Sequence, residues 1–311
     1  MRVLTGLGAV ARPPRRAVVT VGVFDGVHVA HQQLIRSTVR MARRLGGTSV
    51  VITFEPDPQA VLHPDSPAPA LMPLDERLRE LRTLQVDWVW VIRFSRQFAR
   101  MSAEQFIFRI LVRRLQARAL IVGDAFAFGQ GRRGDMTVLR TLGPPQGMRI
   151  ISVKPVTRAG IPVSSSRIRR LIQDGALAQA RRLLGRAPRL YGTVVRGAGR
   201  GRRLGFPTAN LRLIPQVTPP RGVYAVIVEA SGRRRRGVMN LGTRPTFGRG
   251  PVVCEVHLLG FSGMLLGRAV RVALLTRLRG ERRFASPQAL SRQVRRDILR
   301  AQSVFSARSL R

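Results

Sequence analysis

Val21-Gly-Val-Phe-Asp-Gly-Val-His-Val-Ala-His31 is the stretch that decides the fold of the first half of the chain. It ends a short β-branched run, Ala17 to Val23, and leads into an amphipathic stretch, His31 to Leu45. A second β-branched run, Thr48 to Phe54, follows. A strand, a turn, a helix and a second strand form the unit from which parallel sheets are built. The sequence therefore predicts a βαβ unit with this turn at the carboxyl end of its first strand.

The same alternation of strands and helices continues to about Gly185. Further strands are predicted at Trp88 to Ile92, Ala119 to Val122 and Ile150 to Val153, and further helices at Asp75 to Leu84, Ala103 to Leu115, Ser166 to Gln173 and Ala176 to Leu184. This rhythm indicates an α/β domain with a Rossmann-like, doubly wound parallel sheet. We expect that domain to span residues 1–186.

The character of the sequence changes near Arg186 to Leu190, after which short strands are punctuated by Gly and Pro. These strands are predicted at Gly192 to Val195, Val223 to Glu229, Gly237 to Leu241, Val252 to Leu258 and Ala269 to Leu275. Their regular spacing favours a small antiparallel β-barrel. A last amphipathic stretch, Pro287 to about Val304, predicts a terminal helix packed against the barrel. We expect this second, β domain to span residues 187–311.

The composition is that of a globular protein, with 44% hydrophobic residues and a formal charge of +39. No apolar run approaches the roughly 18 residues of a membrane span, and the one cysteine, Cys254, excludes an intrachain disulfide framework. A cytoplasmic location without membrane attachment is therefore expected. The basic excess is almost all arginine, since Lys154 is the one lysine. We attribute it to codon bias at solvated positions.

Nucleic-acid binding is the alternative interpretation of this charge. The run Arg233 to Arg236 and the group Arg200, Arg202 and Arg203 are the candidate segments. No aromatic residue is interleaved with Arg233 to Arg236, and stacking aromatics are typical of proteins that bind single strands. We therefore expect this run to tip a hairpin, and nucleic acid is not an expected partner.

Two histidines stand three residues apart where the first turn enters its helix, so His28 and His31 face the same way. Backbone N–H groups and the helix dipole favour a triphosphate at such a position. The imidazoles would donate hydrogen bonds to phosphate oxygens as negative charge develops in the transition state. No covalent intermediate is required.

Residues 22–31 resemble the GxFDGVHxGH signature of FAD synthetase, a nucleotidylyltransferase of the HxGH type. Thr53-Phe-Glu-Pro56 is similar to its TFEPHP segment, Gly123 to Asp135 to its GxDFRFGxxRxGD flavin loop, and Ser164-Ser-Ser-Arg-Ile-Arg169 to its ISSTxxR motif. The resemblance implies transfer of an adenylyl group from ATP to FMN. It implies catalysis by His28 and His31, ATP binding by Gly22, Phe24, Asp25, Gly26, Ser165, Ser166 and Arg169, and flavin binding by Gly123, Asp124, Phe126 and Phe128.

Three positions depart from the FAD synthetase motifs. Ala30 replaces the glycine of HxGH, and its methyl group would crowd a phosphate that approaches the backbone. Asp57 replaces the histidine of TFEPHP and adds a negative charge near an anionic substrate. Ala125 replaces the Asp or Asn of the flavin loop, beside Asp124. These departures leave open an alternative hypothesis, in which the adenylyltransferase domain has decayed and the chain keeps only the riboflavin kinase activity that the second domain indicates, as described next.

The most specific signal in the chain is Gly192-Thr-Val-Val-Arg-Gly-Ala-Gly-Arg-Gly-Arg-Arg-Leu-Gly-Phe-Pro-Thr-Ala-Asn210. Its glycines allow a backbone to wrap phosphates and its arginines supply charge. With its PTAN ending the stretch closely resembles riboflavin kinase. The resemblance implies that Thr208 and Asn210 bind Mg²⁺ and nucleotide phosphate, as hard oxygen ligands do. Phosphate contacts are expected from Gly197, Gly199, Arg200 and Gly201.

A kinase must also remove a proton from the hydroxyl that attacks the γ-phosphate, which is a task for a carboxylate. In Val253-Cys-Glu-Val-His-Leu258, strand alternation places Glu255 and His257 on one face. On the pattern alone Glu255 is either this base or a solvated strand residue. Resemblance to the family's ExHL strand implies the base. Segments beginning at Asn240 and containing Tyr224 are similar to those that line nucleotide and flavin pockets in the family.

Residues 260–267 read Gly-Phe-Ser-Gly-Met-Leu-Leu-Gly, where riboflavin kinases read close to DFDGDLYG. We expect the missing aspartates to be turn residues; the alternative is weakened flavin binding. The leading hypothesis is a bifunctional enzyme, a monomer or weak oligomer, that uses riboflavin, FMN, ATP and Mg²⁺ to make FMN and FAD. A third hypothesis is a catalytically weak homologue that binds RNA or nucleotide through its basic surface.

Overall fold

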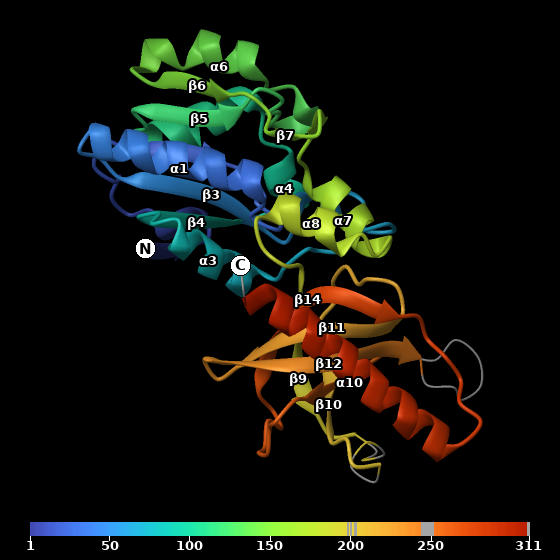
Figure 1. Cartoon of the computed structure of the whole chain (residues 1–311). Helices are drawn as coiled ribbons and strands as arrows, with labels where there is room; N and C mark the ends of the chain where they lie inside the picture. The colour runs from blue at the N-terminus through green and yellow to red at the C-terminus, as the bar shows by residue number, and fades with distance from the viewer. Residues whose placement is uncertain (198, 200, 202–203, 244–251, 310–311) are drawn as a thin grey trace. The chain divides into compact units, whose positions relative to one another are not determined.

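A computed structural model of the chain describes residues 1–197, 199, 201, 204–243 and 252–309 (Figure 1). Contacts divide the chain into two compact units, one of Met1–Ala68 and Pro73–Ser165 and one of Pro69–Met72 and Ser166–Arg311. Helix α8 (Leu177–Leu184) and all but the first residue of α7 (Ser165–Gln173) belong to the second unit. The domain division expected at residue 186 stays a prediction.

The first unit holds the predicted parallel sheet, which has six strands in the order β1-β4-β3-β2-β5-β6. The strands are β1 (Arg2–Thr5), β2 (Val18–Val21), β3 (Ser49–Glu55), β4 (Trp88–Arg93), β5 (Ala119–Gly123) and β6 (Arg149–Val153). Every neighbouring pair is parallel. The edge strand β1 was not predicted, since Leu4 is its one buried residue and its sequence carries no apolar run.

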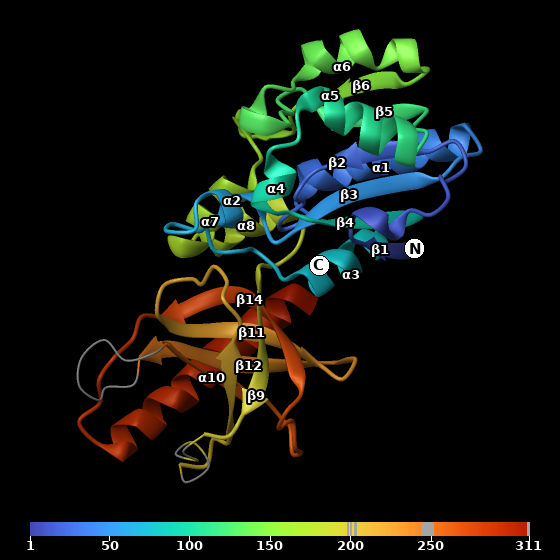
Figure 2. The ribbon, with the colours of Figure 1, turned by 180° about the vertical axis from the view of Figure 1, so that it is seen from behind.

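Helices cover both faces of this sheet. Helix α1 (Val29–Arg44) packs on one face, against Val18, Ala119 and Ile121. Helix α5 (Ala103–Gln105) and its π-helical continuation (Phe106–Arg114) lie on the other face, as the two opposite views show (Figures 1 and 2). The remaining elements are α2 (Pro58–Leu62), α3 (Leu74–Thr83), α4 (Arg96–Ala99), α6 (Met136–Leu142), the hairpin β7 (Thr157–Arg158) and β8 (Ile161–Pro162), and 3₁₀ turns at Leu7–Ala9, Gln130–Arg132 and Pro144–Gln146.

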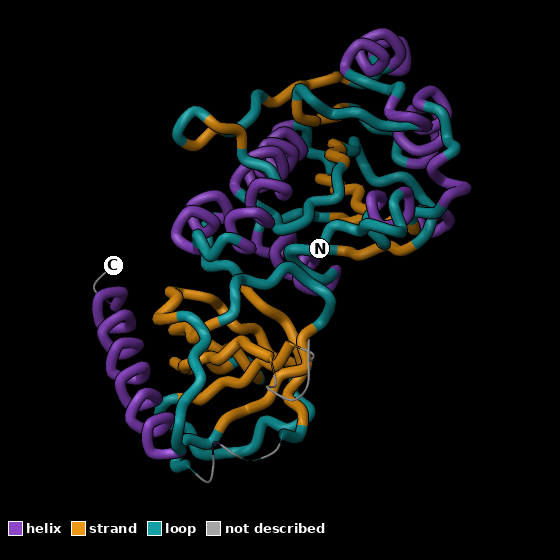
Figure 3. Tube along the Cα trace, turned by 90° about the vertical axis from the view of Figure 1, so that its right-hand side faces the viewer, coloured by secondary structure: helices purple, strands orange, loops and turns teal. Residues whose placement is uncertain are grey.

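The second unit is the predicted antiparallel barrel, closed in the order β10-β13-β12-β11-β14-β9. The strands are β9 (Arg189–Val195), β10 (Thr208–Leu213), β11 (Gly222–Ala230), β12 (Arg233–Thr243), β13 (Val252–Leu258) and β14 (Ala269–Arg279). The terminal helix α10 (Pro287–Ser309) lies along the outside of the barrel (Figure 3), where Ala301 and Phe305 pack on Val223 and Val238. Among the described residues, no helix is long and apolar enough to cross a bilayer.

Strand β12 begins four residues earlier than the predicted strand at Gly237. The turn between β11 and β12 is made by Ser231 and Gly232, which both have positive φ. The run Arg233 to Arg236 follows this turn and pairs with residues 227–230 of β11. The arginines therefore lie within the strand beside the hairpin tip, with their side chains alternating between its two faces.

Candidate active sites

The turn between β2 and α1 has an unusual backbone. Phe24, Gly26 and Val27 have φ values of 55°, 82° and 36°, in the left-handed region. Two of these residues are not glycine, and such conformations persist where the surroundings impose them, often at functional sites. Phe24 is buried beneath the turn, and Ser165 Oγ donates a hydrogen bond to the carbonyl of Asp25 at 2.8 Å. The turn is thus fixed on both sides before any ligand binds.

His28 is the N-cap of α1, and its Nδ1 accepts a hydrogen bond from the backbone N–H of His31 at 3.4 Å. In this hydrogen bond Nδ1 is the unprotonated nitrogen of the His28 ring. The two imidazoles stack with centroids 3.5 Å apart and an interplanar angle of 18°. Phe24 presents its ring edge-on to His31 at 5.2 Å. The structure thus brings together the two histidines that the spacing predicted on one side of the helix.

Three features lower the pKa of His31 well below its usual 6.5: burial, the neighbouring His28 and the positive charge of Arg77. His31 is therefore neutral at pH 7 in the free protein. Its Nδ1 is buried and has no hydrogen-bond partner among the described residues. A buried nitrogen without a partner is costly, so this atom is suited to meet a polar group of a ligand.

Arg77 is a functional candidate that the sequence analysis missed. It is 3% exposed, and its Nη1 donates to Thr53 Oγ1 at 3.2 Å and to the carbonyl of Phe54 at 3.0 Å. Its Nη2 lies 3.3 Å from Glu55 Oε2. Thr53 Oγ1 donates to the carbonyl of Val23 at 2.9 Å, so the guanidinium is linked to the β2–α1 turn. The signal in the sequence was its place four residues before the buried Leu81, on the inner face of α3.

Two of the three departures from the FAD synthetase motifs have a clear structural setting. Asp57 is the N-cap of α2, and its carboxylate accepts a hydrogen bond from the backbone N–H of Gln59 at 2.8 Å. Its negative charge is therefore engaged by a helix start. Ala30 is the second residue of α1 and does not have a positive φ, so the backbone there does not require glycine.

The predicted flavin loop follows β5. Gly123 ends the strand, and Asp124 and Ala125 are both exposed. The rings of Phe126 and Phe128 stack with centroids 5.3 Å apart, and Phe128 is 8% exposed because it also packs on Phe106. The loop thus offers an exposed carboxylate beside an aromatic pair, of which Phe128 belongs to the core of the unit.

Three residues of the predicted ATP-phosphate motif open helix α7. Ser165 is engaged with the carbonyl of Asp25, as described above. Ser166 is exposed, and Arg169 Nε donates to the carbonyl of Pro69 at 2.9 Å. Ser165 belongs to the first unit, whereas Ser166 and Arg169 belong to the second.

In the barrel, three polar residues occupy one row across neighbouring strands. Glu255 of β13 is directly opposite Asn210 of β10 on one side and Asn240 of β12 on the other. The predicted alternation holds, because Cys254 and Val256 are buried in the barrel interior while Glu255 is half-buried on the outer face. Glu255 is thus flanked by two side-chain amides.

The glycine-rich stretch comes close to the polar face of β10. A Cβ added to Gly197 would lie 1.9 Å from Asn210 Nδ2, and one added to Gly201 would lie 3.0 Å from Thr208 Oγ1. Gly199 has a φ of 67°, which favours glycine. His257, opposite Thr208, has its Nδ1 2.8 Å from the carbonyl of Pro207. The glycines therefore let the backbone approach the Thr208 and Asn210 side chains more closely than any other residue would.

The other barrel residues expected to contact nucleotide or flavin, Asn240 and Tyr224, differ in how exposed they are. Asn240 is exposed, next to Gly242, and a Cβ on Gly242 would lie 2.4 Å from Glu281 Oε1. Tyr224 is fully buried in the barrel interior and its hydroxyl donates to the carbonyl of Pro220. In this structure Tyr224 is a core residue, and its contact with a flavin stays a prediction. Arg200, Arg202, Arg203 and residues 244–251 lie outside the described residues.

Residues 260–267 form a turn before β14. Gly260 and Gly267 have positive φ values of 62° and 75°. Phe261 and Leu265 pack against the barrel interior, and Met264 is 85% exposed. The turn is therefore formed without acidic residues, and the role of the aspartates that riboflavin kinases carry there stays a prediction.

Comparisons with known proteins cover both units. A family model for FAD synthetase matches residues 11–167, and one for riboflavin kinase matches residues 184–305. The bifunctional riboflavin kinase/FMN adenylyltransferase of Escherichia coli (strain K12) is 39% identical over 307 residues, or 98% of each chain. The Pseudomonas fluorescens protein of that name is 38% identical over 305 residues, again 98% of each chain. A Streptococcus pneumoniae crystal structure, solved under the name macrolide-efflux protein, is 31% identical with a TM-score of 0.87 and covers 97% of this chain and 99% of its own.

Proposed function

This chain belongs to the family of bifunctional riboflavin kinases and FMN adenylyltransferases, and we propose that each of its two domains holds the site of one reaction. The barrel domain phosphorylates riboflavin to FMN with ATP. The parallel-sheet domain transfers an adenylyl group from a second ATP to FMN, giving FAD and pyrophosphate. We assign the adenylyltransferase domain to residues 1–186 and the kinase domain to residues 187–311.

The observation that carries the kinase assignment is the row of Asn210, Glu255 and Asn240 on the outer face of the barrel. Glu255 accepts the proton of the ribityl hydroxyl as that oxygen attacks the γ-phosphate of ATP. The amides of Asn210 and Asn240 lie on either side of this carboxylate, where they orient it or contact phosphate oxygens. Gly197, Gly199, Arg200 and Gly201 supply the phosphate-binding loop.

Thr208 and Asn210 would hold Mg²⁺ in this site. The fit rests on their donor atoms, a hydroxyl and an amide oxygen, and on the cradle formed by Gly197 and Gly201, which a Cβ at either position would fill. Among the described residues, no group of three or more His, Cys, Asp or Glu side chains could hold a metal by itself. A cation bound by two protein oxygens and by substrate phosphates is the arrangement that Mg²⁺ favours. When bound, the ion neutralises charge on the phosphate oxygens.

In the adenylyltransferase site, His28 and His31 stabilise negative charge on the phosphates of ATP as pyrophosphate leaves. The start of α1 supplies backbone N–H groups and a favourable dipole. A bound triphosphate raises the pKa of His31 from its lowered value, because a negative charge beside the ring favours the imidazolium. Gly22, Phe24, Asp25 and Gly26 shape the turn, and Ser165, Ser166 and Arg169 bind further phosphate oxygens. Gly123, Asp124, Phe126 and Phe128 form the FMN side of the site.

Both activities are retained despite the three sequence departures. The carboxylate of Asp57 caps α2, Ala30 leaves the backbone of α1 unstrained, and Asp124 is exposed beside Ala125. The hypothesis of a decayed adenylyltransferase domain makes the opposite prediction. As partners we propose the small-molecule substrates riboflavin, FMN and ATP, with the chain a monomer or weak oligomer in the cytoplasm, where ATP is available.

The test is chromatographic analysis of the purified chain with ATP and Mg²⁺, started once from riboflavin and once from FMN. FAD produced in both reactions supports the proposal. FMN that accumulates without FAD contradicts the adenylyltransferase assignment. Absence of turnover in both, with salt-dependent retention on RNA, favours the binding-protein hypothesis.

A further inference from the structure

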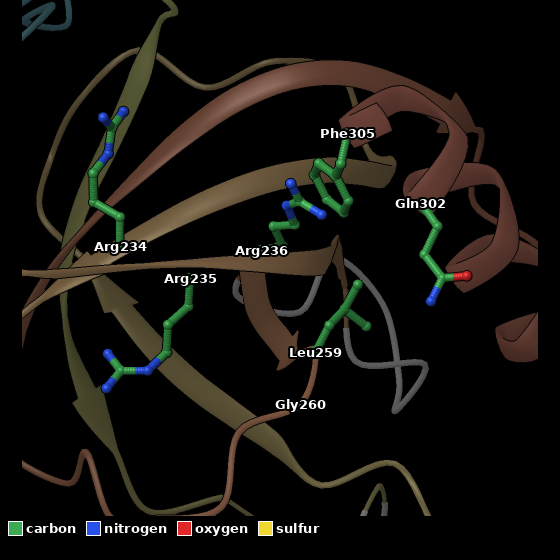
Figure 4. Close-up of a pocket in the computed structure, with 7 residues that line it drawn as sticks. All are labelled: Arg234, Arg235, Arg236, Leu259, Gly260, Gln302 and Phe305. Carbon is green, nitrogen blue, oxygen red and sulfur yellow. The ribbon is translucent and has the colours of Figure 1, made fainter. Parts of the chain in front are cut away.

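A polar cavity lies on the barrel, away from the proposed kinase site. It has a volume of about 470 Å³ and is lined by Arg234, Arg235, Arg236, Leu259, Gly260, Gln302 and Phe305 (Figure 4). Arg234 is six residues from Asn240 along β12, a separation of about 20 Å in an extended strand. The cavity is therefore distinct from the row of Asn210, Glu255 and Asn240.

The arginines of this cavity are arranged by the strand and by aromatic rings. Arg234 and Arg236 project to one side of β12 and Arg235 to the other (Figure 4). The guanidinium of Arg236 lies 5.6 Å from the ring centroid of Phe305 on α10, and that of Arg235 lies 4.4 Å from the ring of Phe261. Cation–π contacts of this kind hold a guanidinium in place while its N–H groups stay directed outward.

No carboxylate of a described residue neutralises Arg234, which is exposed, or Arg235, which is half-buried. Among the described residues, no Asp or Glu oxygen lies within 4.0 Å of the Arg234 or Arg235 guanidinium. Glu229 is opposite Arg234 in the β-ladder, but its carboxylate pairs with Arg271 at 2.7 Å. The wall of the cavity therefore carries two guanidinium groups, those of Arg234 and Arg235, that have no carboxylate partner in the part of the chain that the structure describes.

We propose that this cavity is a binding site for a phosphate-bearing anion, separate from both reaction sites. Planar guanidinium groups bind phosphate oxygens through paired N–H donors, and the side-chain amide of Gln302 adds a further donor. The apolar wall of Leu259 and Phe305 suits the non-phosphate part of such a ligand. The run Arg233 to Arg236 has no aromatic residue in its sequence, but in the folded chain Phe261 and Phe305 lie against Arg235 and Arg236. The anion is either a free polyphosphate or the backbone of a single-stranded nucleic acid.

The test uses the full chain without ATP or Mg²⁺, because ATP is itself a phosphate-bearing anion and would compete with the probes for the cavity. Binding at the two reaction sites is common to both variants compared below. One arm follows a fluorescein-labelled oligouridylate by anisotropy, and the other follows inorganic tripolyphosphate by calorimetry. The variant Arg234→Ala/Arg236→Ala is compared with Arg295→Ala/Arg296→Ala, which removes two exposed arginines from α10 and changes the net charge equally. Retained riboflavin kinase activity establishes that both variants are folded.

We expect the cavity variant to lose about tenfold or more in affinity for at least one probe, and the control variant to lose less than about twofold. Loss for the oligouridylate identifies a nucleic-acid strand as the ligand, and loss for tripolyphosphate alone identifies a free polyphosphate. Equal losses in both variants mean that binding follows overall charge, and they overturn the proposal. Absence of binding by either probe to the unmodified chain overturns it as well.

Discussion

Arg77 donates a hydrogen bond from Nη1 to Thr53 Oγ1 at 3.2 Å, within the unit that carries the two histidines. The hydroxyl of Thr53 in turn donates a hydrogen bond to the carbonyl of Val23 at 2.9 Å. A buried arginine with these partners fixes the end of β3 relative to the β2–α1 turn. Its positive charge also contributes to the lowered pKa of His31. Arg77 is therefore a positioning residue with an electrostatic effect that can be measured separately.

Replacement Arg77→Met should lower FAD formation from FMN by about tenfold or more, because a misplaced turn no longer holds the histidines in register. FMN formation from riboflavin should change by less than about twofold. The pKa of His31, followed by NMR, should rise in Arg77→Met and stay low in Arg77→Lys, since lysine retains the positive charge. If the pKa of His31 is the same in both variants, the charge of Arg77 has no effect on His31, and the role of Arg77 is structural alone.

The pH dependence of the free energy of unfolding should show the effect of the lowered pKa of His31. Its pKa in the folded protein is lowered, so the unfolded chain binds a proton that the folded chain does not bind between that value and 6.5. The free energy of unfolding should therefore fall as the pH is lowered below 6.5. Chemical denaturation at a series of pH values should show a weaker decrease in His31→Gln. The matched control is His63→Gln at an exposed position, which should behave like the unmodified protein.

Gly197 should be essential for the kinase reaction alone. An added Cβ would lie 1.9 Å from Asn210 Nδ2, so alanine must displace the Asn210 side chain. We expect Gly197→Ala to reduce FMN formation by about tenfold or more, since small displacements of positioning groups are costly. FAD formation from FMN should be unchanged. Gly8→Ala, where a Cβ meets no atom within 4 Å, should leave both rates unaffected. Normal kinase activity in Gly197→Ala would show that Asn210 is not needed.

The buried ion pair between Arg279 and Asp297 should stabilise the barrel and its terminal helix. Asp297 is 1% exposed, accepts from Arg279 Nε at 2.9 Å and from Gln293 Nε2 at 2.9 Å. Removing the carboxylate leaves a partly buried guanidinium without its partner. Asp297→Ala should lower the free energy of unfolding of the barrel by about 3 kcal/mol in urea. Asp174→Ala, at an exposed position of the same unit, should cost less than about 0.5 kcal/mol.

The two-domain architecture could be predicted because hydrophobic periodicity is a local signal. A short segment of sequence was enough to predict the apolar strands β2, β3 and β5. The same holds for the alternation around Glu255 in β13. The edge strand β1 was not predicted from the sequence, because Leu4 is its one buried residue and a single apolar position forms no pattern. The motif around Tyr224 did not indicate that its ring is buried in the interior of the closed barrel.

The site could be predicted as a set of residues but not as an arrangement. The spacing of His28 and His31 indicated a shared face, whereas the lowered pKa of His31 depends on burial, on His28 and on the distant Arg77. The contact of Arg236 with Phe305 depends on the packing of α10 against β12. These features arise from residues that are far apart in sequence, so no local pattern contains them.

The most direct test of the account is the Glu255→Gln variant, assayed by chromatography from riboflavin and from FMN in the presence of ATP and Mg²⁺. Glutamine preserves the shape of the side chain beside Asn210 and Asn240 but cannot accept the hydroxyl proton. FMN formation should fall by about 10²-fold or more, while FAD formation from FMN continues at the rate of the unmodified protein. Unchanged FMN formation in Glu255→Gln, or equal loss of both reactions, would contradict two separate sites with Glu255 as the kinase base.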